Sequence, residues 1–321
     1  MVRLDLDRIR LARTTIDPVF LDTPQYECAA LGDVLGCSIT LKIETLNPVR
    51  SFKGRGTETA LSWLAQREEA PTAVCASAGN LGQALAYSGA RRGIPVTVVA
   101  ARTANPFKIE RIAALGARVR LEGDDIEDAR LLARTIAEDE GAHLVEDSLD
   151  LSTCEGAGTI GLELLEGLSQ LDTLVIALGG GALASGVGHV ARSLAPHVEV
   201  VAVQPMGAPA MALSWRCGSV VETDTIDTIA DGVAGRCPIP EVLDDLLIAV
   251  DDVALVGEES IKAGMRLLYR YAGLVVEPSA ALGVAALLEN RKRFAGRRVA
   301  TIICGSNVTT RDYERWVLSP G

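Results

Sequence analysis

Short apolar runs rich in β-branched residues alternate along this chain with longer alanine-rich stretches. The runs have the length and composition of buried strands, and the alanine-rich stretches have those of helices. We expect strands at residues 38–44, 73–76, 96–100, 118–121, 144–146, 173–178, 199–203, 246–250 and 298–304. We expect helices at residues 54–66, 82–92, 106–115, 126–140, 156–168, 184–195, 258–271 and 279–289. Strands separated by helices need crossover connections, which predicts an α/β fold with mostly parallel sheets.

The number of expected strands favours two domains. Nine strands are many for one sheet in 321 residues. The alternation also starts afresh near residue 150, where the segment 150–158 has the small, polar composition of a turn. We therefore predict two α/β domains.

Composition excludes several classes of function. The net charge of −11 argues against nucleic acid or an anionic membrane as a partner. The chain has no apolar run of 18 residues, and its first eight residues lack the apolar core of a secretory signal. The seven cysteines include no C-x-x-C pair, so we expect free thiols and a cytoplasmic location. The three histidines lie far apart in the sequence, which disfavours a metal site or a Ser-His-Asp relay.

Three of the expected strands end in small, polar, glycine-bearing turns. These turns begin at Ser77, Gly179 and Cys304. In open α/β sheets, ligands bind beyond the carboxyl ends of the strands. We therefore expect backbone amides of these turns to face a ligand.

The turn at Gly179 to Gly181 runs directly into a helix, which favours a bound phosphate. Two alternatives remain at this point. The residues Gly179, Gly181 and Ala184 match a dinucleotide fingerprint, with Glu199 twenty residues downstream. However, the acid that binds ribose should end the second strand, whereas Glu199 begins it. A tight turn without a ligand is the other alternative.

A single lysine, Lys53, stands between Phe52 and Gly54 at the start of an expected helix. The chain has only five lysines, so an amine for covalent chemistry has few candidates. Lys53 is either a solvated surface charge or an amine made reactive by the helix dipole and partial burial. The residues alone leave both interpretations open.

Taken together, the segments resemble the fold type II pyridoxal-phosphate enzymes, and within them the serine/threonine dehydratase (ammonia-lyase) family. The matching stretches keep the family's order and cover nearly the whole chain. They are Thr23–Pro24, Leu41–Pro48, Ser51–Gly56, Ser77–Asn80, Gly179–Leu183, Thr228–Val233, Glu277–Ala280 and Cys304–Asn307.

The resemblance implies a two-domain fold like that of tryptophan synthase β, with pyridoxal 5'-phosphate as cofactor. It implies a large domain of residues 1–45 and 150–321 that carries the phosphate loop. A small domain of residues 46–149 would carry the turn that binds the substrate carboxylate, with the active site in the cleft between the domains. It also implies a small amino-acid substrate and a homodimer.

The resemblance further implies roles for individual residues. Lys53 resembles the Schiff-base lysine that also acts as catalytic base, and Phe52 its neighbour near the cofactor. Cys304 takes the position that faces the pyridine nitrogen, and Asn80 resembles the residue that hydrogen-bonds the phenolic oxygen. The implied phosphate cradle is Gly179, Gly180, Gly181, Ala182 and Leu183. The implied carboxylate turn is Ser77, Ala78, Gly79, Asn80 and Leu81.

The activity implied is elimination of water from a serine- or threonine-like amino acid, which yields a 2-oxo acid and ammonia. Alternatives are a cysteine synthase-like or diaminopropionate-type enzyme, or a protein that binds the cofactor without turnover. Ala78 stands where racemases of the family carry a serine, which argues against racemisation. Gln204 and Ala210 replace the acids of the family's cation site, so we expect no strong divalent metal site. A monovalent ion held by backbone carbonyls remains open.

Overall fold

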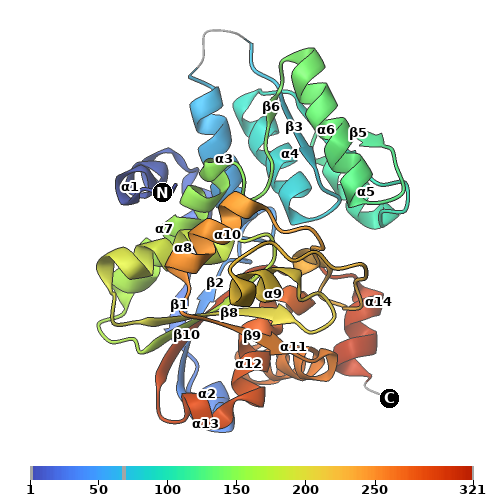
Figure 1. Ribbon diagram of the computed structural model, residues 1–321. Helices are drawn as coiled ribbons and strands as arrows, with labels where there is room; N and C mark the ends of the chain where they lie inside the picture. The colour runs from blue at the N-terminus through green and yellow to red at the C-terminus, as the bar shows by residue number, and fades with distance from the viewer. Residues whose placement is uncertain (1–2, 67–69, 320–321) are drawn as a thin grey trace.

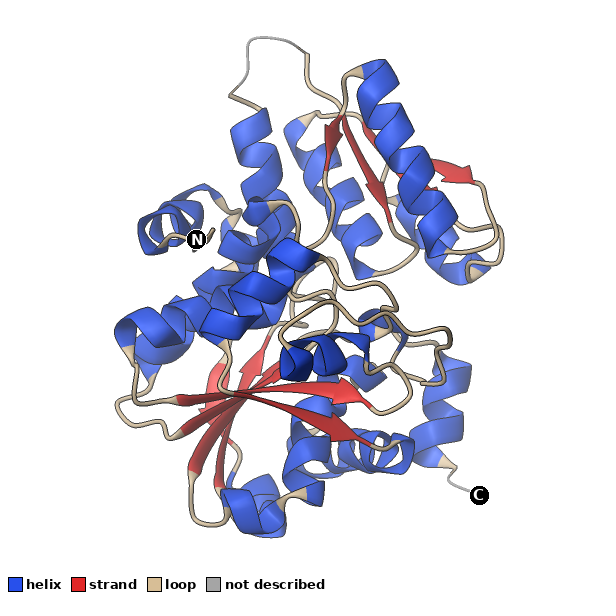
Figure 2. Ribbon diagram, viewed as in Figure 1, coloured by secondary structure: helices blue, strands red, loops and turns tan. Residues whose placement is uncertain are grey.

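The computed structural model describes residues 3–66 and 70–319, so Met1 and Val2 of the N-terminal segment lie outside it. The described chain forms two sheets, each flanked by helices (Figures 1 and 2). The larger sheet has six strands in the order β1-β2-β10-β7-β8-β9, and the smaller has four in the order β5-β4-β3-β6. The expected α/β fold with mostly parallel sheets is confirmed.

The six-stranded sheet joins the two ends of the chain. Its strands are β1 (Gln25–Glu27), β2 (Ser38–Ile43), β7 (Thr173–Ala177), β8 (Glu199–Pro205), β9 (Asp252–Val256) and β10 (Arg298–Ile303). Strand β10 lies between β2 and β7 and is parallel to both. The short edge strand β1 is antiparallel to β2 and was absent from the sequence expectation. The inner strands are buried on both faces, as parallel sheets between helices require.

Helices cover both faces of this sheet. Helices α7, α8 and α10 lie over one face, while α2, α11 and α12 lie over the other (Figure 1). The elements of this part are α1 (Leu6–Thr15), α2 (Ala29–Leu35), α7 (Leu151–Gly167), α8 (Ala182–Leu194), α9 (Ala210–Cys217), α10 (Pro240–Ala249), α11 (Glu258–Ala272), α12 (Leu282–Glu289), α13 (Arg291–Phe294) and α14 (Thr310–Tyr313). Short 3-10 helices are η1 (Pro18–Phe20), η2 (Asp231–Val233) and η3 (Pro278–Ala281), and η4 (Glu314–Leu318) is a short π-helix.

The four-stranded sheet alternates its side chains between two helical layers. Ala73 and Cys75 pack with α3 and α4, whereas Val74 packs against α6. The strands are β3 (Ala73–Ala76), β4 (Val96–Ala100), β5 (Arg118–Leu121) and β6 (His143–Leu144). The helices are α3 (Lys53–Leu64), α4 (Asn80–Arg92), α5 (Pro106–Ala114) and α6 (Ile126–Glu140). The two sheets draw on the segments that we assign to the large and small domains, whose boundaries at residues 46 and 150 stay a prediction.

The strand expected at residues 246–250 is wrong. These residues form the end of helix α10, which begins with Pro240 at its first turn. The buried positions Val242, Leu243, Leu246 and Ala249 follow the spacing of one helical face. The strand in this part of the chain, β9, begins at Asp252, two residues after the end of the expected strand.

The turn expected at residues 150–158 is also wrong. Helix α7 begins at Leu151, and Asp150 caps it by accepting a hydrogen bond from the backbone N–H of Ser152 at 2.9 Å. Its small residues serve close packing, since a Cβ at Gly156 would lie 2.4 Å from the carbonyl oxygen of Arg55. The glycines therefore let α7 approach α3 and do not mark a turn.

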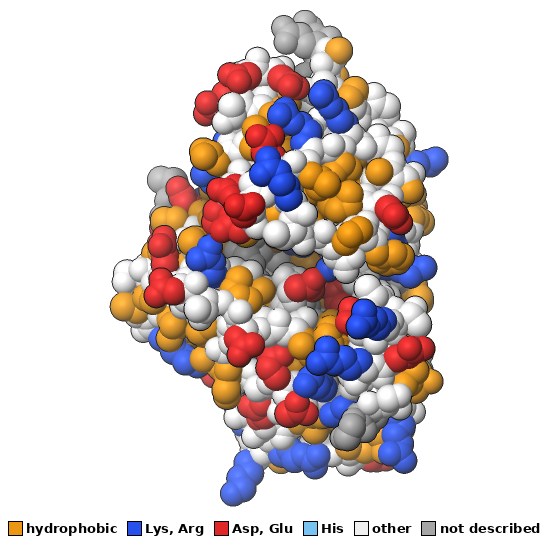
Figure 3. All heavy atoms as spheres, turned by 90° about the vertical axis from the view of Figure 1, so that its right-hand side faces the viewer, with side chains coloured by type: hydrophobic (Ala, Val, Ile, Leu, Met, Phe, Trp, Pro, Cys, Tyr) orange, Lys and Arg blue, Asp and Glu red, His pale blue; other side chains and the backbone are white. Residues whose placement is uncertain are grey.

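No helix in residues 3–66 and 70–319 is long and apolar enough to cross a membrane. Basic and acidic side chains are interspersed on the face shown in Figure 3.

Candidate active site

A cavity of about 410 Å³ lies where the strand ends of the two sheets face each other. Its lining includes every site residue expected from the sequence, which are Phe52, Lys53, Ser77, Ala78, Gly79, Asn80, Leu81, Gly179, Gly180, Gly181, Ala182, Leu183 and Cys304. The structure therefore brings together residues from opposite ends of the chain. Their individual roles stay predictions.

Lys53 is the first residue of α3 and extends into this cavity. Only 14% of its side chain is exposed. Its Nζ lies 4.6 Å from the centre of the Phe52 ring and donates to both carboxylate oxygens of Asp147, at 2.6 and 2.7 Å. The amine is thus a partly buried group inside the cavity, which removes the solvated-lysine interpretation.

The glycine turn offers free backbone donors at the start of α8. Within residues 3–66 and 70–319, the N–H groups of Gly179, Gly180 and Gly181 reach no acceptor. Gly181 has φ of +115°, a conformation that side chains rarely adopt. A Cβ there would lie 2.4 Å from Val242. Unpaired donors at the N-terminus of a 13-residue helix make a site for an anion.

The turn at Ser77 opens the N-terminus of α4 toward the same cavity. Ser77 follows β3, and its hydroxyl accepts a hydrogen bond from the N–H of Gly79 at 3.1 Å. Helix α4 then begins at Asn80. Small side chains at Ala78 and Gly79 leave the backbone accessible, which suits a carboxylate.

A buried carboxylate, Glu277, fixes the orientation of Asn80. The Asn80 Nδ2 donates to Glu277 Oε1 at 2.8 Å, and its Oδ1 accepts from Asn307 Nδ2 at 2.7 Å. The Asn80 amide therefore has one N–H left for a ligand. Burial raises the pKa of Glu277 to about 6, although the N–H of Asn307 and the Asn80 amide oppose the rise.

The chain matches the model of one family, described as pyridoxal-phosphate dependent enzyme, over residues 16–305. It belongs to this family. It is 36% identical to the L-threonine ammonia-lyase of Thermotoga maritima over 312 residues, which are 97% of this chain and 78% of that protein. It is 32% identical to the phenylserine dehydratase of Ralstonia pickettii over 97% of this chain and 95% of that protein. Maize serine racemase superposes with a TM-score of 0.90 at 29% identity, over 96% and 95% of the two chains.

The resemblance to fold type II pyridoxal-phosphate enzymes is thereby confirmed, and the chain is a pyridoxal-phosphate dependent lyase. The cavity fits the cofactor on its own geometry. The free amides of Gly179 to Gly181 suit its phosphate, and the Lys53 amine suits its aldehyde. The volume of about 410 Å³ lies in the usual range for such sites.

Cys304 gives this pyridoxal-phosphate enzyme a neutral group at the end of β10. This residue is 5% exposed. Burial raises the pKa of the Cys304 thiol far above its ordinary value, and the carboxylate of Glu277 adds to the rise. The thiol therefore stays protonated at neutral pH. A neutral partner is what the resemblance implies for the pyridine nitrogen.

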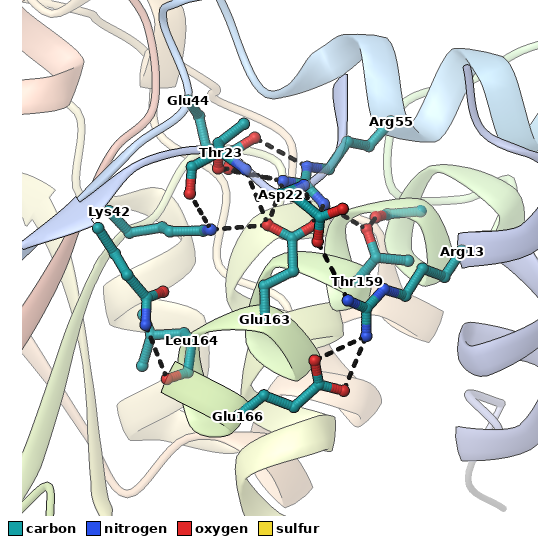
Figure 4. A network of polar contacts seen from close by, with 12 residues as sticks. Arg13, Asp22, Thr23, Lys42, Glu44, Arg55, Thr159, Glu163, Leu164 and Glu166 are labelled. Carbon is teal, nitrogen blue, oxygen red and sulfur yellow. Dashed lines mark hydrogen bonds and ion pairs between the residues drawn. The ribbon is translucent and has the colours of Figure 1, made fainter. Parts of the chain in front are cut away.

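A buried ionic network holds the helix that carries Lys53 (Figure 4). Arg55, two residues after Lys53, is fully buried and donates to Glu44 and Glu163 at 2.6 to 2.9 Å. Lys42 of β2 also donates to Glu163, at 2.6 Å. Burial opposes ionisation, but the hydrogen bonds and charges of Arg55 and Lys42 lower the pKa of Glu163 to about 2. The network joins β2, α3 and α7 and so fixes where α3 begins.

Sequence reasoning missed several residues of this site. Asp147 follows β6, so the rule about strand ends that identified Ser77 and Cys304 could have identified it too. Glu277 and Ser279 stand in a matching stretch, but no role was assigned to them. Ser279 is 2% exposed, and its hydroxyl reaches no partner in the described part of the chain. Lys108 also lines the cavity and pairs with Asp231 across it.

Proposed function

We propose that the chain is an ammonia-lyase for a β-hydroxy amino acid. The reaction removes the α-proton and the β-hydroxyl group as water, and hydrolysis then returns one water and yields a 2-oxo acid and ammonia. The observation that carries the proposal is the meeting of three groups in one cavity. They are the amine of Lys53, the free amides of the glycine turn and the neutral thiol of Cys304.

Pyridoxal phosphate, when bound, supplies the electron sink that makes the α-proton acidic. The residues of this chain bind the substrate, move its α-proton and orient the ring. The backbone amides that stay free in the turn at Ser77 to Leu81 hold the substrate carboxylate, since the N–H groups of Ser77 and Gly79 already donate to Val99 and to the Ser77 hydroxyl. The Lys53 amine accepts the α-proton at Nζ. The Asn80 amide, held by Glu277 and Asn307, orients the ring. Ala78 offers no second proton, which favours elimination over racemisation.

A panel of L- and D-amino acids tests this proposal. Serine, threonine, phenylserine and 3-hydroxyaspartate cover small, aromatic and acidic β-substituents, and 2-oxo acid and ammonia are measured together. We expect equal amounts of both products from at least one L-substrate. Cofactor binding without any 2-oxo acid would favour a protein that binds the cofactor without turnover, and a new thioether or amine product would favour β-replacement.

The variant Lys53→Ala is the control for this assay. Lys53 is the first residue of α3 and no other lysine stands in this helix, so none can replace its amine at the same position. We expect the visible absorption band of the bound cofactor, at about 410 nm, to disappear together with turnover. Retention of both would refute the assignment of Lys53.

The proposal also includes a homodimer that works in the cytoplasm. All seven cysteines lie in the described part of the chain and are unpaired there, which suits a reducing compartment. Sedimentation equilibrium should give twice the chain mass of 33.8 kDa. A mass of one chain at micromolar concentration would contradict the dimer and leave the proposed activity untouched.

A further inference from the structure

Lys53 has a dedicated acidic partner inside the cavity. Both oxygens of the Asp147 carboxylate accept hydrogen bonds from Lys53 Nζ, at 2.6 and 2.7 Å. The Asp147 side chain is only 28% exposed. This is the one acidic group that Lys53 contacts within residues 3–66 and 70–319.

The backbone around Asp147 is held from two helices. The next residue, Ser148, is fully buried and has φ of +68°, although it is not glycine. Its N–H donates to Thr153 Oγ1 of α7 at 3.0 Å, and its hydroxyl accepts from the N–H of Ala182 of α8 at 2.9 Å. A backbone conformation that is unusual for serine is therefore fixed by both helices, and it sets the position of Asp147.

Asp147 also lies beside the glycine turn. A Cβ added at Gly180 would be 3.5 Å from Asp147 Oδ2. The carboxylate thus stands between the Lys53 amine and the amides that suit a phosphate. The other charged groups on this cavity have their own partners. Lys108 pairs with Asp231, Arg130 with Glu127, and Glu277 accepts from Asn80 and Asn307.

We propose that Asp147 is a positioning residue that holds the free amine of Lys53 as an ammonium at one point of the cavity. The inference rests on the proposed function in that Lys53 is the reacting amine. When Lys53 accepts the α-proton, that proton becomes the third N–H of the ammonium, and Asp147 stabilises the added charge. The proton then leaves with the β-hydroxyl group as water, which returns Lys53 to the neutral amine.

The proposal predicts how fast Lys53 reacts when no cofactor covers it. An acylating reagent is attacked by the lone pair of an amine that is free to reach it, so the two hydrogen bonds that hold Lys53 Nζ against Asp147 slow the reaction. The full chain is freed of cofactor with hydroxylamine, its fold is checked by circular dichroism, and it is treated with acetic anhydride at pH 7.5. Peptide mass spectrometry then gives the acetylation rate of Lys53, with the exposed Lys292 as internal reference.

We expect Lys53 to react about tenfold faster in Asp147→Asn than in the wild type, because the amide loses one of the two oxygen acceptors and the charge that hold Nζ, and one hydrogen bond to a charged group contributes about that factor. Asp147→Glu keeps the negative charge, so acetylation of Lys53 should stay as slow as in the wild type. Glu146→Gln is the matched control, because the adjacent Glu146 pairs with Arg134 instead of Lys53. This control should leave the rate unchanged.

A second measurement separates the loss of the Asp147 charge from a loss of local structure. The buried Cys154 Sγ donates to the carbonyl oxygen of Ser148 at 3.4 Å, so its thiol reports local opening. It should stay unreactive toward maleimide in Asp147→Asn. Equal Lys53 rates in Asp147→Asn and the wild type, a fast Asp147→Glu, or a newly reactive Cys154 would each overturn the proposal. No substrate is present, so these results are independent of whether the enzyme forms a 2-oxo acid.

Discussion

The thiol of Cys304 is neutral because it is buried, and this makes its replacement informative. Cys304→Ser keeps a neutral, weak hydrogen-bonding group, so elimination should continue at a substantial rate. Cys304→Asp would place a charge there and favour a protonated ring nitrogen. A hydrogen bond to a charged group contributes about 1.5–3 kcal/mol, which corresponds to about tenfold or more in rate. We expect elimination by the Asp variant, measured by 2-oxo acid release, to fall by at least that factor. Undiminished elimination would mean that Cys304 does not face the ring nitrogen.

Ala78 leaves the carboxylate turn without a side-chain proton. On the proposed assignment, Lys53 serves one face of the substrate and nothing at residue 78 serves the other. The wild type should therefore leave L- and D-serine uninterconverted in a chiral chromatography assay. Ala78→Ser should introduce some racemisation, with a gain below the roughly 10²–10⁴-fold of a well-placed acid or base. Clear racemisation by the wild type would show that another group, such as water, supplies the second proton.

The pKa of Glu277, raised to about 6 by burial, links the site to the pH dependence of stability. A carboxyl group whose pKa rises on folding stabilises the folded state below its ordinary pKa of 4.5, and this contribution is lost as the pH rises through 6. The shift corresponds to about 2 kcal/mol. The unfolding free energy of the wild type minus that of Glu277→Gln should thus fall by about 2 kcal/mol between pH 4 and pH 7 in urea titrations. A difference in unfolding free energy that stays the same from pH 4 to pH 7 would contradict the raised pKa of Glu277.

The predicted site residues came in part from the turns and in part from the family resemblance. The glycine turn at Gly179 indicated an anion site on its own, whereas the residues alone left Lys53 open between a surface charge and a reactive amine, and the resemblance assigned its role. Asp147 directly follows the strand expected at residues 144–146, so the rule about strand ends could have identified it. Its contact with Lys53 could not be predicted in this way, because the two residues lie 94 positions apart in the sequence.

At the scale of elements, the network around Glu163 ties α7 to α3 and β2. Glu163→Gln leaves Arg55 and Lys42 buried with less negative charge to balance them. Breaking a buried ion pair costs about 3–5 kcal/mol, so we expect a loss of unfolding free energy of about 3 kcal/mol at pH 7, measured in urea. The pKa of Glu163 is lowered, so its contribution persists above pH 4.5 and is lost as the pH falls toward 2.

Glu166 provides a control on the same helix. It lies one turn further along α7 and pairs with Arg13 at the surface, where 59% of the Glu166 side chain is exposed (Figure 4). Exposed pairs contribute about 0–1 kcal/mol. Glu166→Gln should therefore change the unfolding free energy by less than about 1 kcal/mol. Similar losses of unfolding free energy in Glu163→Gln and Glu166→Gln would mean that burial of the network does not increase its contribution to stability.

The errors at the level of elements have physical causes. Residues 246–250 are a five-residue apolar run, and such a run fits a buried helix end as well as a strand. Residues 150–158 combine glycine, serine and threonine, which favour turns in isolation. In the folded chain the neighbouring helices α3 and α8 need small side chains there, and packing overrides the local preference.

At the scale of the whole molecule, the cavity draws on both sheets, so a bound cofactor should stabilise both together. At a hundredfold excess over its dissociation constant, a ligand adds about 2.7 kcal/mol. For a chain of this size we expect a rise in melting temperature of about 5 °C in a single transition. Differential scanning calorimetry with increasing pyridoxal phosphate checks this. A transition that splits, with only one part shifted, would mean that the cofactor contacts one part alone.

The central position of β10 bears on how the chain folds during synthesis. This strand separates β2 from the group β7-β8-β9, and it comes after all of them in the sequence, so it leaves the ribosome after them. The smaller sheet lies within residues 73–144, so all its strands are available before the larger sheet can close. Domains fold as units during translation, and the smaller sheet should form first. Until β10 emerges, one edge of β2 and one edge of β7 stay open, so we expect the nascent chain to need chaperone protection most just before β10 is free to pair.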